Sequence, residues 1–285
     1  MPRPTAAPLA LLLALLLAAC SGAPPAPAAA PSPGPSGRLS VFAAASLGDA
    51  FEAIGAAFEA GHPGAEVDFH FAGSQQLVAQ INEGAPADVL ATASAAHMQA
   101  AVAGGRVASG TEQTFALNRL VVVVPKDNPA GIASVQDLAQ PGLRLILADA
   151  AVPAGQYSLE VLAKASALPA YTESFSPTVL ANVVSYEDNV RSVLAKVALG
   201  EGDAGIVYTT DAALEAERVA LVEIPDELNV IATYPAAPIA DSPNPELARA
   251  FMAYLLGPEG QAALGRHGFI SPDVGGAGAA PGRGL

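Results

Sequence analysis

Short apolar runs alternate along this chain with stretches in which apolar residues recur every three or four positions. Residues 47–58 are typical of the second kind, because Leu47, Phe51, Ile54 and Phe58 would share one face of a helix. Strands alternating with helices predict the α/β class, with mostly parallel sheets. The other predicted helices are 74–81, 155–167 and 190–199, and the predicted strands are 39–43, 66–71, 87–91, 120–124, 143–148 and 205–208.

Two interruptions divide this pattern. Four valines at 121–124 are followed by Pro125, as in a buried strand stopped by proline, and further prolines begin with Tyr234-Pro235. Two α/β lobes joined at two places would explain both interruptions. We therefore expect a first lobe at 38–120, a second lobe at 121–232, a return to the first lobe at 233–270 and a flexible tail at 271–285.

The N-terminal region has the features of an export signal. Residues 9–19 are continuously apolar and follow a single charge at Arg3, and they are too few to span a bilayer, which needs about 20. The segment ends at Cys20, the only cysteine in the chain, in a Leu-Ala-Ala-Cys sequence that resembles a lipobox. We expect residues 1–20 to be a lipoprotein signal peptide with Cys20 as the lipidation site. The alternative is a leftover cysteine beside an ordinary cleavage site.

Residues 21–37 hold six prolines and three glycines, a composition that favours an extended tether over a packed core. The signal and tether together predict an exported protein, anchored in a membrane and facing the periplasm or cell exterior.

The charge balance limits the partners. Without Arg3 the chain has 12 basic and 27 acidic residues, a net charge of −15, and no basic cluster, so nucleic acid is excluded as a partner. At long range this charge repels anions. A receptor for an anion on this chain must therefore use local donors.

Four predicted strand ends lie next to predicted helix starts. Ser46 with Asp49 is a candidate capping box, Ser74 a candidate N-cap, Pro153 suits a first helical turn, and residues 186–191 open the fourth helix. A helix N-terminus presents unpaired N–H groups and a partial positive charge, and such ends meet at the carboxyl edge of a sheet. The four starts together predict a site for an anion held without basic side chains.

Tyr208 completes this arrangement, because the strand 205–208 would carry its phenol to the same edge of the sheet. The phenol could donate one more hydrogen bond. From spacing alone, a tyrosine that is simply packed at a strand end is the alternative.

At these positions residues 39–269 resemble the molybdate-binding proteins of bacterial ABC importers. The resemblance implies a two-lobed class II periplasmic binding protein, with helices on both faces of its sheets and a ligand cleft between the lobes. The segments that carry it, in the family's order, are VFAAASL (41–47), FAGS (71–74), GAPADV (84–89), VPAG (152–155), EDNVR (187–191) and GIVY (205–208).

The resemblance also implies the site and the partners. The ligand is molybdate or tungstate, passed to an ABC permease by a monomeric receptor that has no catalytic residue, no cofactor and no direct metal ligand. Two features depart from the pattern we expect: Gln75-Gln76 replaces smaller residues, which could alter the pocket's size, and the stretch around Asn189 varies in length. The implied contacts are the hydroxyls of Ser46, Ser74 and Tyr208 and the backbone N–H groups of Ala154 and Val190, with Ala45 as a further donor.

Two other kinds of function are alternatives to this one. The same fold could hold sulfate or another tetrahedral oxyanion. A serine hydrolase using Ser46 or Ser74 is the enzyme alternative, but the chain has no Gly-x-Ser-x-Gly elbow, and its four histidines lack metal-ligand spacing. Arg191, which follows the fourth helix start, is interpreted as a lobe-stabilising or surface residue.

Overall fold

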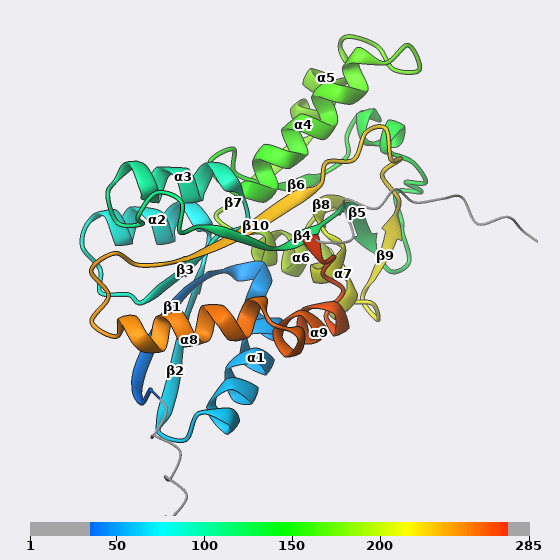
Figure 1. The fold of residues 1–285 in the computed structure, drawn as a ribbon. Coiled ribbons are helices and arrows are strands. Elements are labelled where there is room, and N and C mark those ends of the chain that lie inside the picture. The colour runs from blue at the N-terminus through cyan, green and yellow to red at the C-terminus, as the bar shows by residue number, and fades with distance from the viewer. Residues whose placement is uncertain (1–34, 273–285) are drawn as a thin grey trace, which may run out of the picture. The chain divides into compact units, whose positions relative to one another are not determined.

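The computed structural model describes residues 35–272, which form two five-stranded sheets with helices around them (Figure 1). The signal segment with Cys20, the tether up to residue 34 and the tail beyond residue 272 lie outside the described residues. The strands are β1 (Gly37–Ala44), β2 (Ala65–Ala72), β3 (Val89–Ala91), β4 (Gln113–Asn118), β5 (Leu120–Pro125), β6 (Leu145–Ala148), β7 (Val183–Glu187), β8 (Ala204–Tyr208), β9 (Val219–Val222) and β10 (Ala232–Pro238). The helices are η1 (Ala45–Leu47), α1 (Gly48–Gly61), α2 (Ser74–Asn82), α3 (Ala95–Ala103), η2 (Val135–Ala139), α4 (Pro153–Ala167), α5 (Phe175–Ala181), α6 (Val190–Ala198), α7 (Thr209–Leu214), α8 (Pro245–Leu256) and α9 (Pro258–Arg266).

The two sheets define two lobes. The first lobe contains the sheet β2-β1-β3-β10-β4, and the second contains β7-β6-β8-β5-β9. The chain passes to the second lobe at Arg119, between β4 and β5, and returns between β9 and β10. Asn229, on the return segment, pairs with both backbone groups of Leu120: its Oδ1 accepts from the Leu120 N–H at 3.1 Å, and its Nδ2 donates to the Leu120 carbonyl at 2.9 Å. The two passages are therefore hydrogen-bonded to each other.

Both sheets are mixed, with four of the five strands in each pointing the same way, and the expected α/β class is confirmed. In the first sheet β1 runs parallel to β2 and β3, while β10 runs antiparallel to β3 and β4. In the second sheet β6 runs parallel to β7 and β8, while β5 runs antiparallel to β8 and β9. β5 and β10 are the first strands after each passage between the lobes. A parallel strand needs a crossover connection, usually a helix, and no helix precedes these two strands in their passage, so they run antiparallel to their neighbours.

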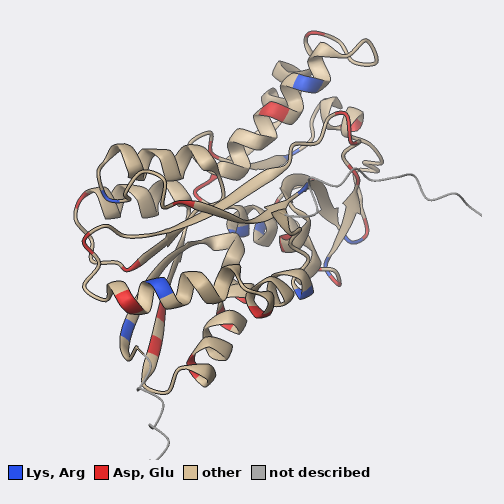
Figure 2. Ribbon diagram, viewed as in Figure 1, with Lys and Arg blue, Asp and Glu red and all other residues tan. Residues whose placement is uncertain are grey.

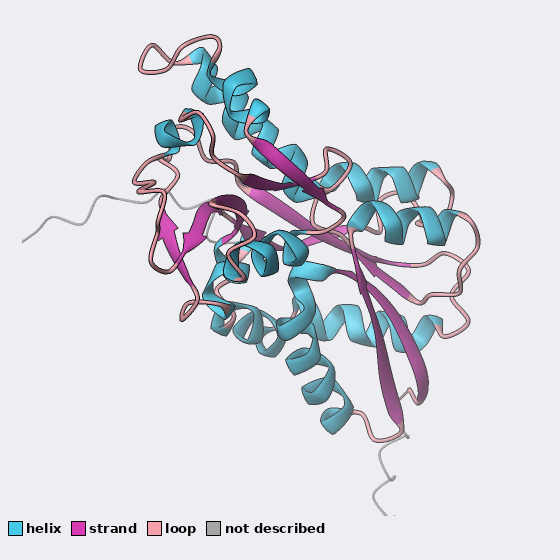
Figure 3. Cartoon of the chain, turned by 180° about the vertical axis from the view of Figure 1, so that it is seen from behind, coloured by secondary structure: helices cyan, strands magenta, loops and turns pink. Residues whose placement is uncertain are grey.

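Helices cover both faces of the first sheet, as Figures 1 and 3 show. Alternate residues of β1 point to opposite faces: Val41 joins a core with Phe51 and Phe251 of α1 and α8, and Phe42 joins a second core with Leu77 of α2. This alternation explains why β1 is apolar along its whole inner length. Its carboxyl end is thereby fixed between two helical layers.

Every helix and strand expected from the pattern is present, with small shifts at the ends. The pattern missed strands β4, β7, β9 and β10 and helices α3, α5, α7, α8 and α9. Acidic and basic residues are scattered over both lobes (Figure 2). Within residues 35–272, no helix combines the length and the apolar character needed to cross a membrane.

Candidate anion-binding site

A small pocket lies where the strand ends of the two lobes meet. The helical segments η1 and α2, which follow β1 and β2, contribute from the first lobe; α4, α6 and the end of β8 contribute from the second. Its empty volume, part of it open to solvent, is about 220 Å³. The structure brings all six predicted contact residues to this pocket: Ala45, Ser46, Ser74, Ala154, Val190 and Tyr208.

The two serines do not cap helices as the sequence predicted. The N-cap of α1 is Leu47 without a side-chain bond, and the N-cap of α2 is Gly73, one residue before Ser74. The Ser46 Oγ lies 3.0 Å from the buried Tyr234 hydroxyl, and the Ser74 Oγ accepts from the Ala93 N–H at 3.0 Å. Tyr234 and Ala93 both belong to the first lobe. Buried polar groups need a hydrogen-bond partner, and the two serines provide one for the Tyr234 hydroxyl and for the Ala93 N–H.

This arrangement orients the serine hydroxyls as donors. Since the Ser74 Oγ already accepts a bond, its own hydrogen is free to point into the pocket. The same holds for Ser46 when the Tyr234 hydroxyl donates to it, and either of these oxygens can be the donor. Ser46 and Ser74 are only 4% and 1% exposed, so any bond they make to a ligand is shielded from water.

The second lobe presents two helix starts to the pocket. Pro153 occupies the first turn of α4, as predicted, and places Ala154 next to it. The Asn189 side chain caps α6 by accepting from the Ser192 N–H at 3.0 Å, which leaves Val190 as the first helical residue. The first N–H groups of a helix have no partner within it, so Ala154 and Val190 offer backbone donors whatever their side chains.

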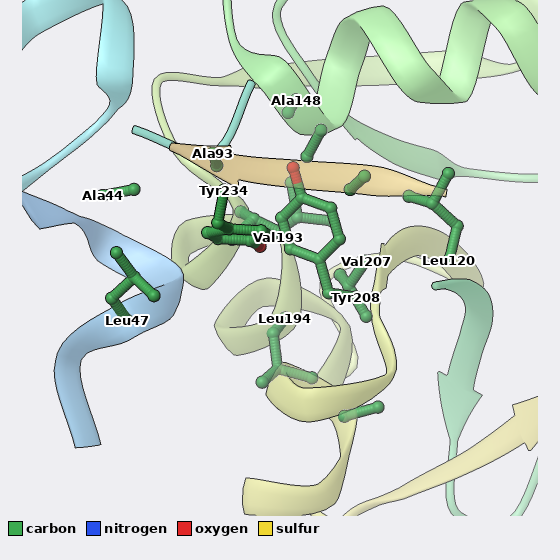
Figure 4. Close-up of a cluster of buried hydrophobic side chains, with 14 of the residues drawn as sticks. Ala44, Leu47, Ala93, Leu120, Ala148, Val193, Leu194, Val207, Tyr208 and Tyr234 are labelled. Carbon is green, nitrogen blue, oxygen red and sulfur yellow. The ribbon is translucent and has the colours of Figure 1, made fainter. Parts of the chain in front are cut away.

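Tyr208 contributes a polar atom without a protein partner. Its side chain is 1% exposed, and its hydroxyl is one of four buried side-chain atoms that make no hydrogen bond within residues 35–272. Figure 4 shows its ring beside Tyr234, with ring centroids 5.7 Å apart. Burial raises the pKa of the Tyr208 phenol well above its usual value, so it keeps its proton. A buried unpaired O–H is costly, and a ligand in the pocket would satisfy it.

Arg191 lies beside the pocket, but its charge is engaged by carboxylates. Its Nη2 donates to Asp49 of the first lobe at 2.8 Å, and its Nε donates to Asp211 of the second lobe at 2.5 Å. Burial raises the Asp211 pKa to about 7 although Arg191 opposes the shift. Of the two expectations for Arg191, the lobe-stabilising role is the one that this geometry supports, because the side chain ties α6 to α1.

Gln75 and Gln76 do not line the pocket, contrary to the expectation that they could alter its size. Both side chains reach instead to Asp188, in the second lobe. Sequence reasoning also missed Tyr234 as the partner of Ser46. No local signal marks this pair, since 188 residues separate them.

The arrangement gives no support to the metal and hydrolase alternatives. Among residues 35–272, no three side chains of the His, Cys, Asp or Glu type gather as metal ligands. His97 does bond a serine, Ser94, at 2.7 Å, but that hydroxyl caps α3 and is not part of the pocket. Neither Ser46 nor Ser74 has a histidine among its hydrogen-bond partners.

Residues 39–270 match the family described as bacterial extracellular solute-binding protein. The chain belongs to this family. It is 38% identical to the molybdate-binding protein ModA of Mycobacterium tuberculosis, over 81% of this chain and 84% of that protein. It is 33% identical to ModA of Escherichia coli, over 82% of this chain and 89% of that protein.

Solved structures agree on the architecture of this solute-binding protein. The sulfate-binding protein SubI of M. tuberculosis superposes with a TM-score of 0.75 at 22% identity, covering 83% of this chain and 87% of that chain. At this identity the likeness supports the fold alone. It supports the resemblance to a two-lobed periplasmic binding protein, and the ligand must be argued from the pocket.

Proposed function

We propose that this solute-binding protein captures molybdate, and tungstate with it, in the pocket between its lobes and delivers it to an ABC permease. The observation that carries the proposal is the set of donors around the pocket. The hydroxyls and backbone N–H groups of the six contact residues are all uncharged, and the relatives with 38% and 33% identity are named for molybdate binding.

Uncharged donors suit a fully ionised oxyanion. Each hydrogen bond to a charged group contributes about 1.5–3 kcal/mol, and buried donors keep this contribution because water does not compete for them. The net negative charge of the chain does not prevent binding, since salt screens fields beyond about 8 Å at physiological ionic strength.

The same donors would discriminate against protonated anions. The backbone N–H groups of Ala154 and Val190 can only donate, and the Ser74 oxygen already accepts from the Ala93 N–H. A phosphate oxygen that carries a proton is a poorer acceptor for these donors, at a cost of about 1–3 kcal/mol for a donor left without a good partner. We therefore expect phosphate to bind far more weakly than molybdate.

Sulfate is the second candidate, because it is also a fully ionised tetrahedral oxyanion and a sulfate-binding protein shares the fold. It needs the same donors in a slightly smaller pocket. The identity to molybdate-binding relatives places molybdate first.

The experiment is a thermal-unfolding series of the purified protein with molybdate, tungstate, sulfate and phosphate, followed by calorimetry. An anion at 100 times its Kd stabilises the fold by about 2.7 kcal/mol. We expect this stabilisation with molybdate and tungstate and much less with phosphate. A protein whose unfolding temperature moves with neither molybdate nor tungstate would exclude the proposal.

The remaining parts of the proposal concern the surroundings. Lipidation of Cys20 would anchor the receptor outside the cytoplasmic membrane, monomeric and without catalytic activity, with residues 21–37 as the tether. Metabolic labelling with a fatty-acid analogue tests the anchor: the label should enter the wild-type chain and be lost in Cys20→Ala.

A further inference from the structure

We propose that Gln75, Gln76 and Gly73 form a clamp that holds the two lobes closed on Asp188 and so sets how long the bound anion is retained. This inference rests on the proposed function, because it concerns release of the same ligand from the same pocket. Neither the three clamp residues nor Asp188 needs to discriminate between anions.

The first observation is a pair of hydrogen bonds that cross the cleft. From the start of α2, the Gln75 Nε2 donates to the Asp188 carbonyl at 2.8 Å, and the Gln76 Nε2 donates to the Asp188 carboxylate at 3.1 Å. Both glutamines belong to the first lobe and Asp188 to the second, between β7 and α6. These bonds exist only while the lobes are together.

The second observation is the closeness of the two backbones at this point. A Cβ atom added to Gly73 would lie 2.4 Å from the Asp188 carbonyl oxygen, far inside van der Waals contact. Gly73 has φ −60° and ψ 139°, which any residue can adopt. The approach of the second lobe, rather than the local backbone conformation, therefore requires glycine here.

The third observation concerns the charge of Asp188, which precedes the pocket residues Asn189 and Val190. An unbalanced carboxylate beside an anion site would oppose binding. Here Gln76 donates to one carboxylate oxygen, and the Asn189 Nδ2 donates to the other at 2.8 Å. When the lobes part, the Gln76 hydrogen bond is lost. The contact between the lobes is then weaker, and the Asp188 carboxylate has one hydrogen-bond donor fewer.

The two glutamines should contribute unequally. The second amide atom of Gln75, Oε1, is buried without a partner in the described part of the chain, which offsets part of the gain from its Nε2. The second amide atom of Gln76 accepts from the Gly73 N–H at 3.2 Å and completes the α2 cap. Gln76 is therefore the stronger member of the clamp.

The test variant is Gln76→Glu, which keeps the acceptor for the Gly73 N–H but replaces the donor to Asp188 with a second carboxylate. We expect the molybdate dissociation rate, measured by stopped-flow displacement, to rise by about 5-fold to 30-fold. The same factor should appear with tungstate, because Gln76 and Asp188 do not line the pocket that holds the anion. Adding Asp188→Asn restores a donor–acceptor pair and should bring the rate back to within about threefold of wild type.

Gln99→Glu is the matched control. Gln99 also donates from a first-lobe helix to a carboxylate, that of Glu112, at 3.1 Å, but within one lobe. Its variant should leave the dissociation rate unchanged. If Gln76→Glu releases molybdate at the wild-type rate, or if Asp188→Asn does not rescue it, the clamp is excluded while the proposed function stands. If the wild type binds neither oxyanion, the proposed function itself fails.

Gly73→Ala tests the clamp through the space between the lobes, because the added methyl would meet both the Asp188 carbonyl oxygen and the Gln75 amide that donates to it. The added methyl should keep the lobes apart and weaken molybdate binding at least about tenfold, with the ligand-free unfolding temperature unchanged because the open form has room for it. Gly61→Ala, at a glycine of the same lobe with nothing within 4 Å of the added carbon, is the control and should bind as wild type. Equal binding by both variants would overturn the proposal.

Discussion

The two sides of the pocket offer the same chemistry by different means. The first lobe supplies side-chain hydroxyls, Ser46 and Ser74, each held by a partner in its own lobe. The second lobe supplies backbone N–H groups at the starts of α4 and α6, and a Tyr208 hydroxyl that has no partner. On the first side the hydroxyl oxygens are thus held in place before a ligand arrives, whereas the Tyr208 hydroxyl on the second side has no protein partner to hold it.

This difference decides which substitutions can be informative. On the first side, removing a hydroxyl deletes a donor and also disturbs its lobe. On the second side, most substitutions leave the backbone N–H groups in place. Only a substitution by proline, which has no N–H, tests whether one of them binds the ligand.

Val190→Pro removes a backbone donor and also changes a buried side chain, for which Val190→Ala is the control. Val190 is the first residue of α6 and follows the extended Asn189 (φ −158°, ψ 164°), so proline fits there and the helix should persist. Loss of one bond to the anion should weaken molybdate binding by about 1.5–3 kcal/mol in calorimetry. Val190→Ala trims the side chain but keeps the N–H, and we expect it to bind within about threefold of wild type. Equal affinities in the two variants would show that this N–H does not contact the ligand.

Ser46→Ala and Ser74→Ala should each weaken binding by about 1–3 kcal/mol. Unlike Val190→Pro, each also leaves a buried first-lobe donor unpaired: the Tyr234 hydroxyl or the Ala93 N–H. The ligand-free protein should therefore lose stability as well, which urea titration without anion would measure. Wild-type affinity in both variants would move the ligand away from the first lobe.

Tyr208→Phe should show the opposite combination. It removes a buried hydroxyl that has no partner, so the ligand-free protein should become more stable, by up to about 1 kcal/mol, while molybdate binding weakens by about as much. Thermal unfolding without molybdate measures the gain in stability of the ligand-free protein, and the smaller stabilisation on adding molybdate measures the loss of binding. A less stable ligand-free variant would mean that the hydroxyl already has a partner, and the contrast between the two sides of the pocket would be lost.

These residues also show how far the sequence could predict the site. Helix starts and strand ends are local features, so the positions of Ala154, Val190 and Tyr208 followed from spacing and from the family resemblance. The caps proposed for Ser46 and Ser74 were wrong because distant partners decided the outcome. Ser46 lies beside Tyr234 only because β10 returns to the first lobe after the whole second lobe.

The fold shows the same division between local and distant causes. Strands such as β5, buried and continuously apolar, were evident in the sequence, whereas β7 was not: its residues are only partly buried, with Val184 and Tyr186 more than half exposed. The mixed sheets depend on where the chain passes between lobes. Periodicity along the chain does not contain this information.

The smallest predicted effect concerns His97, a buried residue at a contact between the lobes, whose protonation should lower the stability of the fold. Its Nε2 lies 2.9 Å from the Ala151 carbonyl oxygen, across the cleft, and its Nδ1 faces Ser94. Burial lowers the His97 pKa below 6.5, although the bond to Ala151 partly opposes this. The folded protein therefore binds this proton less readily than the unfolded chain, and the His97 contribution to stability, full above pH 6.5, is lost as the pH falls below it.

Replacing His97 isolates this contribution. In His97→Gln an amide can still donate to Ala151, but nothing titrates at that position, so stability should decline less between pH 7 and pH 5 than in the wild type. Asp211 titrates in the opposite sense, because burial raises its pKa to about 7, and its contribution declines as the pH rises from 3.8 toward 7. That carboxylate is present in both proteins and cancels in the comparison of their urea midpoints. Identical pH dependence in the two proteins would mean that His97 has the same proton affinity in the folded and unfolded chain, and burial at the cleft would then have no energetic consequence.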